Sequence, residues 1–262
     1  MDIARVSVPV ETRAPTGATN AYLISADGTS LLLDPAARTA DLDSLVEERG
    51  VDHIAVTHTH PDHVGAVADY ARETGATVWC RRGRERMFQT ATGIAATETF
   101  IEGTTIPVGP GIDVLDTPGH ARDHVTFVAD DEYVCGDLAV AEGSVVVGAP
   151  AGDMRAYLVA LRRLYARNPR RLHPGHGPVI DDSRRVLERL IDHRRAREEK
   201  VEAAIRNGAR TPDEVTDAAY DKDISAVYDL ARATVVAHIE KLAAERRVRW
   251  EAESELVEPR DD

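Results

Sequence analysis

Cysteine and lysine are both scarce in this sequence, and each shortage excludes a class of protein. Only Cys80 and Cys135 occur, too few for the disulfide framework of a small secreted domain. We expect both to be small core residues. Lysine is confined to three positions, so arginine carries nearly all of the positive charge. The formal net charge of −13 disfavours electrostatic capture of nucleic acid, except by local arginine clusters. The three lysines are Lys200, Lys222 and Lys241.

Long apolar runs are also missing. No stretch is long and apolar enough to predict a transmembrane helix, and the first residues lack the basic and apolar segments of a signal peptide. We therefore expect a cytoplasmic protein without a membrane partner. The acidic, lysine-poor composition favours a halophilic protein, because salt screens self-repulsion. The alternative is a genome rich in G and C, whose codons favour Arg, Ala, Val and Asp.

The first two thirds of the chain predict a mixed α/β domain. With 262 residues, 43% of them hydrophobic, the chain can form one large domain or a domain with a small appendage. Residues 21–35 predict two antiparallel strands joined at Asp27-Gly28. Further strands are expected at 51–57 and 76–80 and in three runs between 112 and 140, with helices between some of them. Such a mixture is typical of sheets with helices packed outside.

The pattern changes after about residue 180. Residues 181–207 predict a long amphipathic helix with charges on its outer face. Thr211 and Glu214 form a capping-box pattern that begins a second helix, a third is expected over 225–245, and a short strand follows it. We therefore predict domains at 1–180 and 181–262. The second has the element order of a winged-helix-like unit, and its long helix could also form a homodimer.

The stretch HTHPDH, residues 58–63, is the densest group of metal-capable side chains. Neutral imidazole and carboxylate are good ligands for zinc and similar divalent ions. In a loop that leaves a strand, His58 and His60 can face one position while Asp62 and His63 face a neighbouring one. The spacing therefore fits two adjacent metal sites better than one.

Three further candidates follow apolar runs downstream, and each has a glycine beside it that lets the backbone approach a crowded site. They are His120, Asp137 and His176. Together with the HTHPDH stretch they make seven metal ligands. We expect one ion at His58, His60 and His120, a second at Asp62, His63 and His176, and Asp137 between the two.

These motifs resemble the metallo-β-lactamase superfamily. Asp34 in LLLDP, the HTHPDH stretch, His120, Asp137 and His176 match its five motifs in order, over roughly residues 15–180. The resemblance implies an α/β fold, an αββα sandwich with a two-metal site at one edge of the sheets. Zinc is the expected ion, with Mn²⁺ or Fe²⁺ as alternatives. True β-lactamases lack the bridging Asp137, which is similar to glyoxalase II and nuclease-type members, so penicillin hydrolysis is not expected.

A narrower resemblance extends into the C-terminal region. The stretches TPGHARDHVTF, HPGHGPVI and IDHRRAREEKV look like the lactamase-beta-2-like group, whose members carry a small, mainly helical winged-helix-like tail. Animal members of that group are associated with endoribonuclease activity on single-stranded RNA. Many microbial relatives are described only as glyoxalase-II-like hydrolases.

We therefore expect a dinuclear metal-dependent hydrolase that uses a metal-bound hydroxide. Asp62 is the predicted catalytic residue, orienting the nucleophile or relaying a proton while it contacts the second ion. The expected substrate is a small-molecule ester or thioester, and single-stranded RNA is the main alternative. Arginines could bind either the anionic thiol carrier or RNA phosphates. They are Arg81, Arg82, Arg84 and Arg86. A non-catalytic nucleic-acid-binding protein and an iron-bearing oxidase or sulfur dioxygenase are further alternatives.

We interpret the other acidic and imidazole side chains as supporting either the metal site or the fold. Asp34 is expected to accept backbone N–H bonds and brace the histidine loop, and His124 to support a ligand by hydrogen bonding. We expect His53 and His238 to be structural. Two histidines could either line the substrate cleft or have no role in it. His173 could simply end a strand. His193 lies with Arg194 and Arg197 on a helix face that we expect to be solvated.

Overall fold

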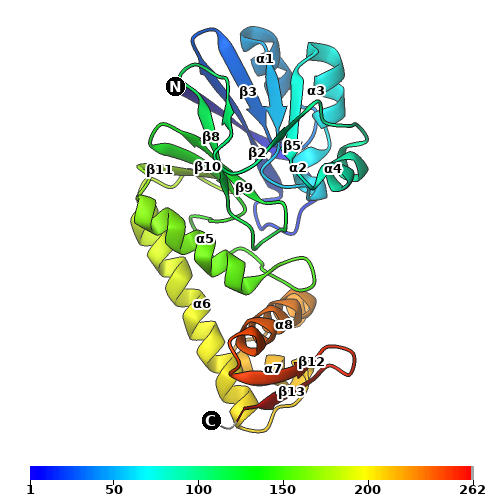
Figure 1. Cartoon of the computed structure of the whole chain (residues 1–262), viewed down its shortest axis with the longest axis vertical. Coiled ribbons are helices and arrows are strands. Elements are labelled where there is room, and N and C mark those ends of the chain that lie inside the picture. Colours follow the sequence, from blue (N-terminus) through cyan, green and yellow to red (C-terminus); the bar gives the residue numbers. More distant parts are fainter. Residues whose placement is uncertain (261–262) are drawn as a thin grey trace.

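Two β-sheets pack face to face in the N-terminal part of the chain, as Figure 1 shows. The computed structural model describes residues 1–260. The first sheet has the strand order β1-β2-β3-β4-β5-β6, and the second the order β11-β10-β9-β8-β7. Their bounds are β1 Asp2–Pro9, β2 Ala18–Ala26, β3 Thr29–Leu33, β4 His53–Ala55, β5 Thr77–Arg81, β6 Glu98–Phe100, β7 Thr105–Ile106, β8 Ile112–Asp116, β9 Val125–Ala129, β10 Glu132–Gly136 and β11 Arg171–Pro174.

Local sequence explains how the first sheet is connected. Asp27 and Gly28 have φ angles of 51° and 79°, as a two-residue hairpin turn requires, and they join β2 to β3 in antiparallel register. From β3 to β6 the strands run parallel, so each connection must cross a face of the sheet. The crossings use helices α1 Ala40–Arg49, α2 Pro61–Val64, α3 Val67–Thr74 and α4 Glu85–Thr92.

Strand alternation places the core on both sides of this sheet. Leu31 and Leu33 pack with Phe127 of the second sheet, whereas Leu32 packs with Leu42 and other residues of the outer helices. Helices α5 (Met154–Arg167) and α6 (Ser183–Arg206) cover the outer face of the second sheet. The layers are therefore helix, sheet, sheet and helix, which confirms the predicted αββα sandwich.

Helix α6 continues beyond the sandwich into a smaller, mainly helical unit (Figure 1). This unit adds α7 (Pro212–Ala219), α8 (Tyr228–Ala244) and the antiparallel pair β12 (Val248–Glu251) and β13 (Leu256–Pro259). Thr211 caps α7, and Glu214 completes the capping box as predicted. The winged-helix interpretation and the boundary near residue 180 stay predictions.

The expectation of a solvated charged face on α6 is wrong for the side that meets α8. Arg194, Glu198 and Glu202 are all buried. Lys241 of α8 donates to Glu198 over 2.7 Å, and Nδ1 of His238 lies 3.4 Å from the other oxygen of Glu198. The sequence could not reveal this network, because its partners lie about forty positions apart and only the tertiary fold brings them together.

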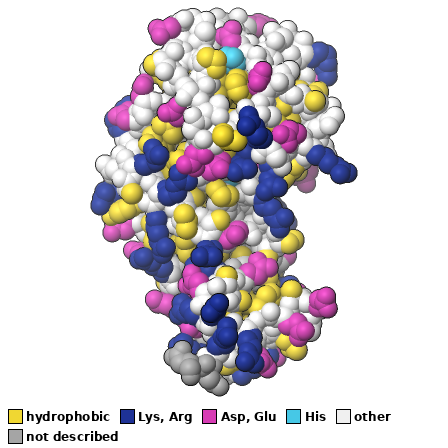
Figure 2. All heavy atoms as spheres, viewed as in Figure 1, with side chains coloured by type: hydrophobic (Ala, Val, Ile, Leu, Met, Phe, Trp, Pro, Cys, Tyr) yellow, Lys and Arg dark blue, Asp and Glu magenta, His cyan; other side chains and the backbone are white. Residues whose placement is uncertain are grey.

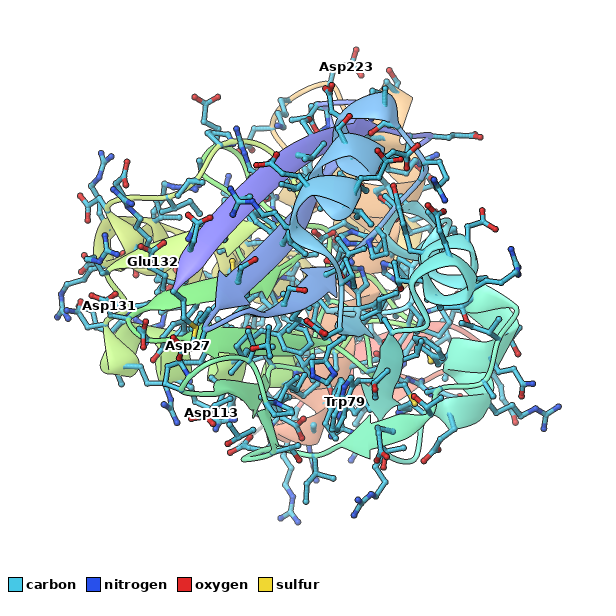
Figure 3. All side chains as sticks on the ribbon, turned by 90° about the horizontal axis from the view of Figure 1, so that it is seen from above. Asp27, Trp79, Asp113, Asp131, Glu132 and Asp223 are labelled. Atoms are coloured by element: carbon cyan, nitrogen blue, oxygen red, sulfur yellow. The ribbon has the colours of Figure 1, made fainter. Side chains whose placement is uncertain are left out.

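Elsewhere charged side chains cover the surface in mixed groups. On the face in Figure 2, Lys and Arg side chains are interspersed with Asp and Glu. At the hairpin between β9 and β10, Asp131 and Glu132 lie close together (Figure 3), and both pair with Arg170. None of the helices within residues 1–260 is long and apolar enough to cross a membrane.

Candidate metal centre

Strand ends from both sheets bring all seven predicted ligands to one edge of the sandwich. The HTHPDH stretch follows β4, and the others follow β8, β10 and β11. A shift of register between Val134 and Gly136 at the end of β10 precedes Asp137. The donor atoms form three overlapping groups, each within 4.8 Å. The groups are His58, His60 and His120; His58, His63 and Asp137; and Asp62, His63 and His176.

In the first group, the imidazoles of His58 and His120 each point a nitrogen at the imidazole of His60. Nε2 of His58 lies 3.0 Å from Nδ1 of His60, and Nε2 of His120 lies 2.9 Å from the same atom. The other ring nitrogen of His58 and of His120, Nδ1, faces a hydrogen-bond acceptor. Nδ1 of His120 donates to the carbonyl of Val146 over 2.7 Å. Nδ1 of His58 is 3.1 Å from the hydroxyl of Thr57.

These contacts fix which nitrogens carry protons. The Thr57 hydroxyl donates to Asp34 over 2.7 Å, so it accepts from His58. In the neutral rings, Nε2 of His58 and of His120 therefore present lone pairs. Nδ1 of His60 carries at most one proton, so at least one of the two short N···N approaches sets lone pair against lone pair. A cation between the three nitrogens removes that repulsion, and the arrangement fits a metal ion.

Burial keeps His58 and His60 neutral. It lowers the pKa of His60 to about 4 and, with the neighbouring imidazoles acting in the same direction, lowers that of His58 well below its usual value. A neutral imidazole is the form that binds a metal ion.

The ligands outside the first group, His63, His176, Asp62 and Asp137, repeat the pattern around carboxylates. Nδ1 of His63 donates to Asp34 over 3.0 Å, and Nδ1 of His176 donates to the carbonyl of Ala18 over 2.8 Å. Nε2 of His176 faces Asp62 at 3.6 Å and Asp137 at 3.4 Å. Nε2 of His63 and Oδ1 of Asp137 are 3.7 Å apart and buried, and neither has a hydrogen-bond partner among the described residues. Two such unpaired atoms facing each other fit a cation bound between them.

The charge balance of this pocket also favours a cation. Burial alone would lower the pKa of His63, but the carboxylates of Asp137 and Asp34 outweigh it and raise that pKa to about 9. Burial alone would raise the pKa of Asp137, but His63 and His176 lower it strongly. The pocket thus holds positive charge at neutral pH, as a proton on His63 or as a metal ion in its place.

Asp34 and Gly175 shape the centre without joining the ligand groups. The Asp34 carboxylate accepts from the backbone N–H of Thr57 over 2.6 Å as well as from His63, so it braces the histidine loop. At Gly175 a Cβ would lie 2.4 Å from Oδ1 of Asp137. Only glycine allows the β11 loop to pass this close to the carboxylate.

His124 has no nitrogen free to bind a metal ion. Its Nε2 accepts from the backbone N–H of Asp137 over 3.1 Å, and its Nδ1 lies 2.9 Å from the hydroxyl of Thr117. Burial lowers its pKa to about 3, so the ring stays neutral. His124 therefore holds the backbone at Asp137.

The other histidines lie outside the three ligand groups. His53 accepts a hydrogen bond from Trp79 of β5. His173 is mostly buried and pairs with Glu132. His238 pairs with Glu198 on α6, as described above. His193 is solvent-exposed on α6, so no contact places it at the centre. Of the four arginines considered for substrate binding, Arg81 forms an ion pair with Asp116 over 2.5 Å.

Sequence reasoning missed several contacts to the centre, among them one to Asp62 and one to His120. The hydroxyl of Thr12 donates to Oδ2 of Asp62 over 2.5 Å, and the carbonyl of Val146 holds His120. Thr12 lies in an irregular segment with no motif around it, and a backbone carbonyl leaves no trace in a sequence. Neither position carried a signal that could have identified it.

The family model of the metallo-beta-lactamase superfamily matches residues 14–176. The chain belongs to this superfamily. Its membership and its clustered His and Asp groups confirm the predicted class, a metal-dependent hydrolase of this fold. A solved metallo-beta-lactamase family protein from Thermus thermophilus, TTHA1429, aligns with 98% of both chains at a TM-score of 0.78 and 24% identity. That likeness supports the fold through the C-terminal unit.

Two curated relatives are 27% identical to the chain. An atrochrysone carboxyl ACP thioesterase of Aspergillus fumigatus matches over 76% of this chain and 64% of its own length. A beta-lactamase-like protein 2 homolog of Drosophila melanogaster matches over 88% of this chain and 84% of its own length. The chain thus spans slightly less than two thirds of the thioesterase and most of the second relative.

Proposed function

We propose that this protein is a dinuclear, metal-dependent hydrolase of thioesters, with zinc as the resident ion. The observation that carries the proposal is the orientation of the imidazoles. Four of the five ligand histidines bind an oxygen through Nδ1 and turn Nε2 inward, toward His60 or Asp137. Such an arrangement serves a bound cation and has no use in an ordinary polar core.

Two divalent ions in this position would lower the pKa of a water molecule and stabilise the charge that develops on the attacked carbonyl. Asp62 is the group beside them with capacity to take a proton. Its side chain is 18% exposed, so it is accessible to water, while the Thr12 hydroxyl fixes one of its oxygens. As the new C–O bond forms, Asp62 accepts the proton of the attacking water. The C–S bond then breaks, and the departing sulfur takes that proton from Asp62 to leave as a thiol, which returns Asp62 to its carboxylate form.

A thioester is favoured over RNA by two observations. The first is the likeness to the Aspergillus thioesterase. The second is the distribution of charge: the protein has a net charge of −13, and on the face in Figure 2 basic side chains are interspersed with acidic ones. Phosphate binding needs an unneutralised basic surface. Arg81, a candidate for that role, is neutralised by Asp116.

The test is a substrate panel run on purified protein loaded with Zn²⁺ or, separately, with Mn²⁺. The panel contains acyl thioesters of glutathione, coenzyme A and N-acetylcysteamine, an oxygen ester of the same acyl group, and a labelled single-stranded RNA. Each reaction is repeated with chelator. We expect chelator-sensitive thiol release that is faster than hydrolysis of the oxygen ester.

The protein is first shown to contain two ions per chain. If it then cleaves RNA and hydrolyses no thioester, the endoribonuclease function replaces the one proposed. Thiol release that persists after the ions have been removed would contradict the dinuclear mechanism.

A further inference from the structure

The segment between β10 and α5, residues 137–153, lies between the candidate metal centre and the C-terminal helices. On one side the Val146 carbonyl accepts the Nδ1 proton of His120 over 2.7 Å. On the other side the backbone N–H of Ala149 donates to the carbonyl of Ala233 in α8 over 3.1 Å. The segment has no helix or strand of its own, so its shape depends on such contacts. We call it the β10–α5 loop.

Arg194 of α6 holds this loop from a buried position. Its side chain donates to the carbonyl of Val145, and its guanidinium lies 5.6 Å above the ring of Tyr157. The residue is 3% exposed, and its Nε has no hydrogen-bond partner in the described part of the chain. It forms no ion pair with any carboxylate among residues 1–260. Burial lowers its pKa, a measure of how costly the charge is there.

A second arginine holds the same loop from the surface. Arg189, five residues earlier on α6, donates to the carbonyls of Val140, Ala141 and Gly143. Its side chain is exposed. The two arginines therefore bind four carbonyls of one irregular segment, and the residue after the last of them supplies the acceptor for His120.

We propose that Arg194 is a positioning residue for the ligand His120, acting through the β10–α5 loop. By binding the Val145 carbonyl it fixes the orientation of the next peptide, whose carbonyl accepts from His120. That hydrogen bond keeps Nδ1 of His120 protonated and turns its Nε2 toward His60 and Asp137. Arg189 supports the same loop from outside. The inference rests on the proposed metal centre but on no particular substrate.

A merely structural role, attaching the C-terminal helices to the sandwich, makes a different prediction. His120 belongs to the group with His58 and His60 and not to the group with Asp62, His63 and His176. Loss of the Arg194 contact should therefore weaken one ion and spare the other. A general loosening of the fold would weaken both.

The experiment titrates the metal-free full-length protein with Co²⁺ alone and follows the two binding steps by absorption and by the shifted NMR signals of ligand imidazole protons. The variants are Arg194→Met, Arg194→Lys and Arg189→Met. Arg185→Met is the matched control, because Arg185 is an exposed α6 arginine that pairs with its neighbour Asp182. Circular dichroism checks that each variant is folded.

In Arg194→Met we expect the dissociation constant of one Co²⁺ binding step, the step at His58, His60 and His120, to rise by roughly 10- to 100-fold. Other groups that orient a metal ligand have effects of this size. The Nδ1 proton of His120 should exchange faster with solvent. Arg194→Lys should restore part of the affinity, Arg189→Met should show a smaller change of the same step, and Arg185→Met should match the wild type.

Equal weakening of both steps, or wild-type affinity in folded Arg194→Met, would overturn the proposal. If Arg194→Met does not fold, Arg189→Met decides: unchanged binding there rejects a role of the loop in positioning His120. No substrate is used, so a wrong thioester assignment would leave this result unaffected.

Discussion

The hydroxyl of Thr12 donates a 2.5 Å hydrogen bond to Oδ2 of Asp62, a residue fifty positions away. The next residue, Arg13, forms an ion pair with Asp229 at the start of α8. The N-terminal segment therefore connects the predicted catalytic carboxylate with the C-terminal unit, and it leads to the first prediction.

Replacement of Thr12 by valine should reduce kcat while leaving the fold intact. Valine keeps the shape but leaves Asp62 without its donor, and a hydrogen bond to a charged group is worth about 1.5–3 kcal/mol. We expect kcat to fall roughly 10- to 100-fold. Thr105→Val is the matched control, because Thr105 makes a similar 2.6 Å bond to Asp113 on β8, and neither residue belongs to a ligand group. Equal loss in both variants would rule out a specific role.

Asp62→Ala should retain the fold and lose activity. Proton transfer by a positioned side chain contributes about 10²- to 10⁴-fold to a rate, and we expect a loss in that range in steady-state hydrolysis of the best thioester. Asp69→Ala, which removes an exposed carboxylate on α3 paired with Arg72, serves as control. Near-wild-type turnover in Asp62→Ala would refute the assigned role.

Asp34→Asn should lower metal content more than substrate affinity. The carboxylate accepts three hydrogen bonds, two from Thr57 and one from His63, and an amide cannot accept all three. Loss of such a group typically costs about 10- to 100-fold in metal affinity. Metal analysis after dialysis against a weak chelator measures the effect, with KM determined at saturating metal. Unchanged metal content would count against the bracing role.

His238 should make the protein less stable in acid. Burial lowers its pKa in the folded state, against the opposing effect of Glu198 and in the same direction as nearby Arg194 and Lys241. The unfolded chain, with a histidine pKa of about 6.5, therefore binds the proton more readily. This contribution destabilises the fold as pH drops below about 6.5 and is absent above it.

The comparison that isolates this effect is wild type against His238→Gln in urea unfolding, both free of metal ions. The other buried histidines titrate in both proteins and cancel in the difference. We expect the free energy of unfolding to fall less steeply between about pH 6.5 and 5 in the variant. Parallel curves would show that His238 does not contribute.

Much of the site could be read from the sequence because its residues follow strands. His58, His120, Asp137 and His176 each come after a short apolar run, and strand ends on one edge of a sandwich meet in space. The hairpin at Asp27-Gly28 and the capping box at Thr211 were equally local signals. All of these depend on neighbours in the chain.

The remaining features depend on tertiary contacts, which local patterns do not encode. The bond between Thr12 and Asp62 joins an irregular segment to a loop, and the acceptor of His120 is a backbone carbonyl. On α6, Arg194 looks like one more charge of a solvated helix face, because only the packed structure shows that the β10–α5 loop and Tyr157 bury it.

Helix α6 has a mechanical consequence. It runs for 24 residues without a break, about 36 Å at the usual rise, from the sandwich to the end of the C-terminal unit. It therefore forms a rigid connection and not a hinge, because moving the C-terminal unit away from the sandwich would break backbone hydrogen bonds of α6. Motion beside the centre is then left to two segments that have no helix or strand of their own, residues 10–17 and the β10–α5 loop. The same two segments hold Asp62 and His120, so a substrate that pushes them apart also disturbs the groups that act on it.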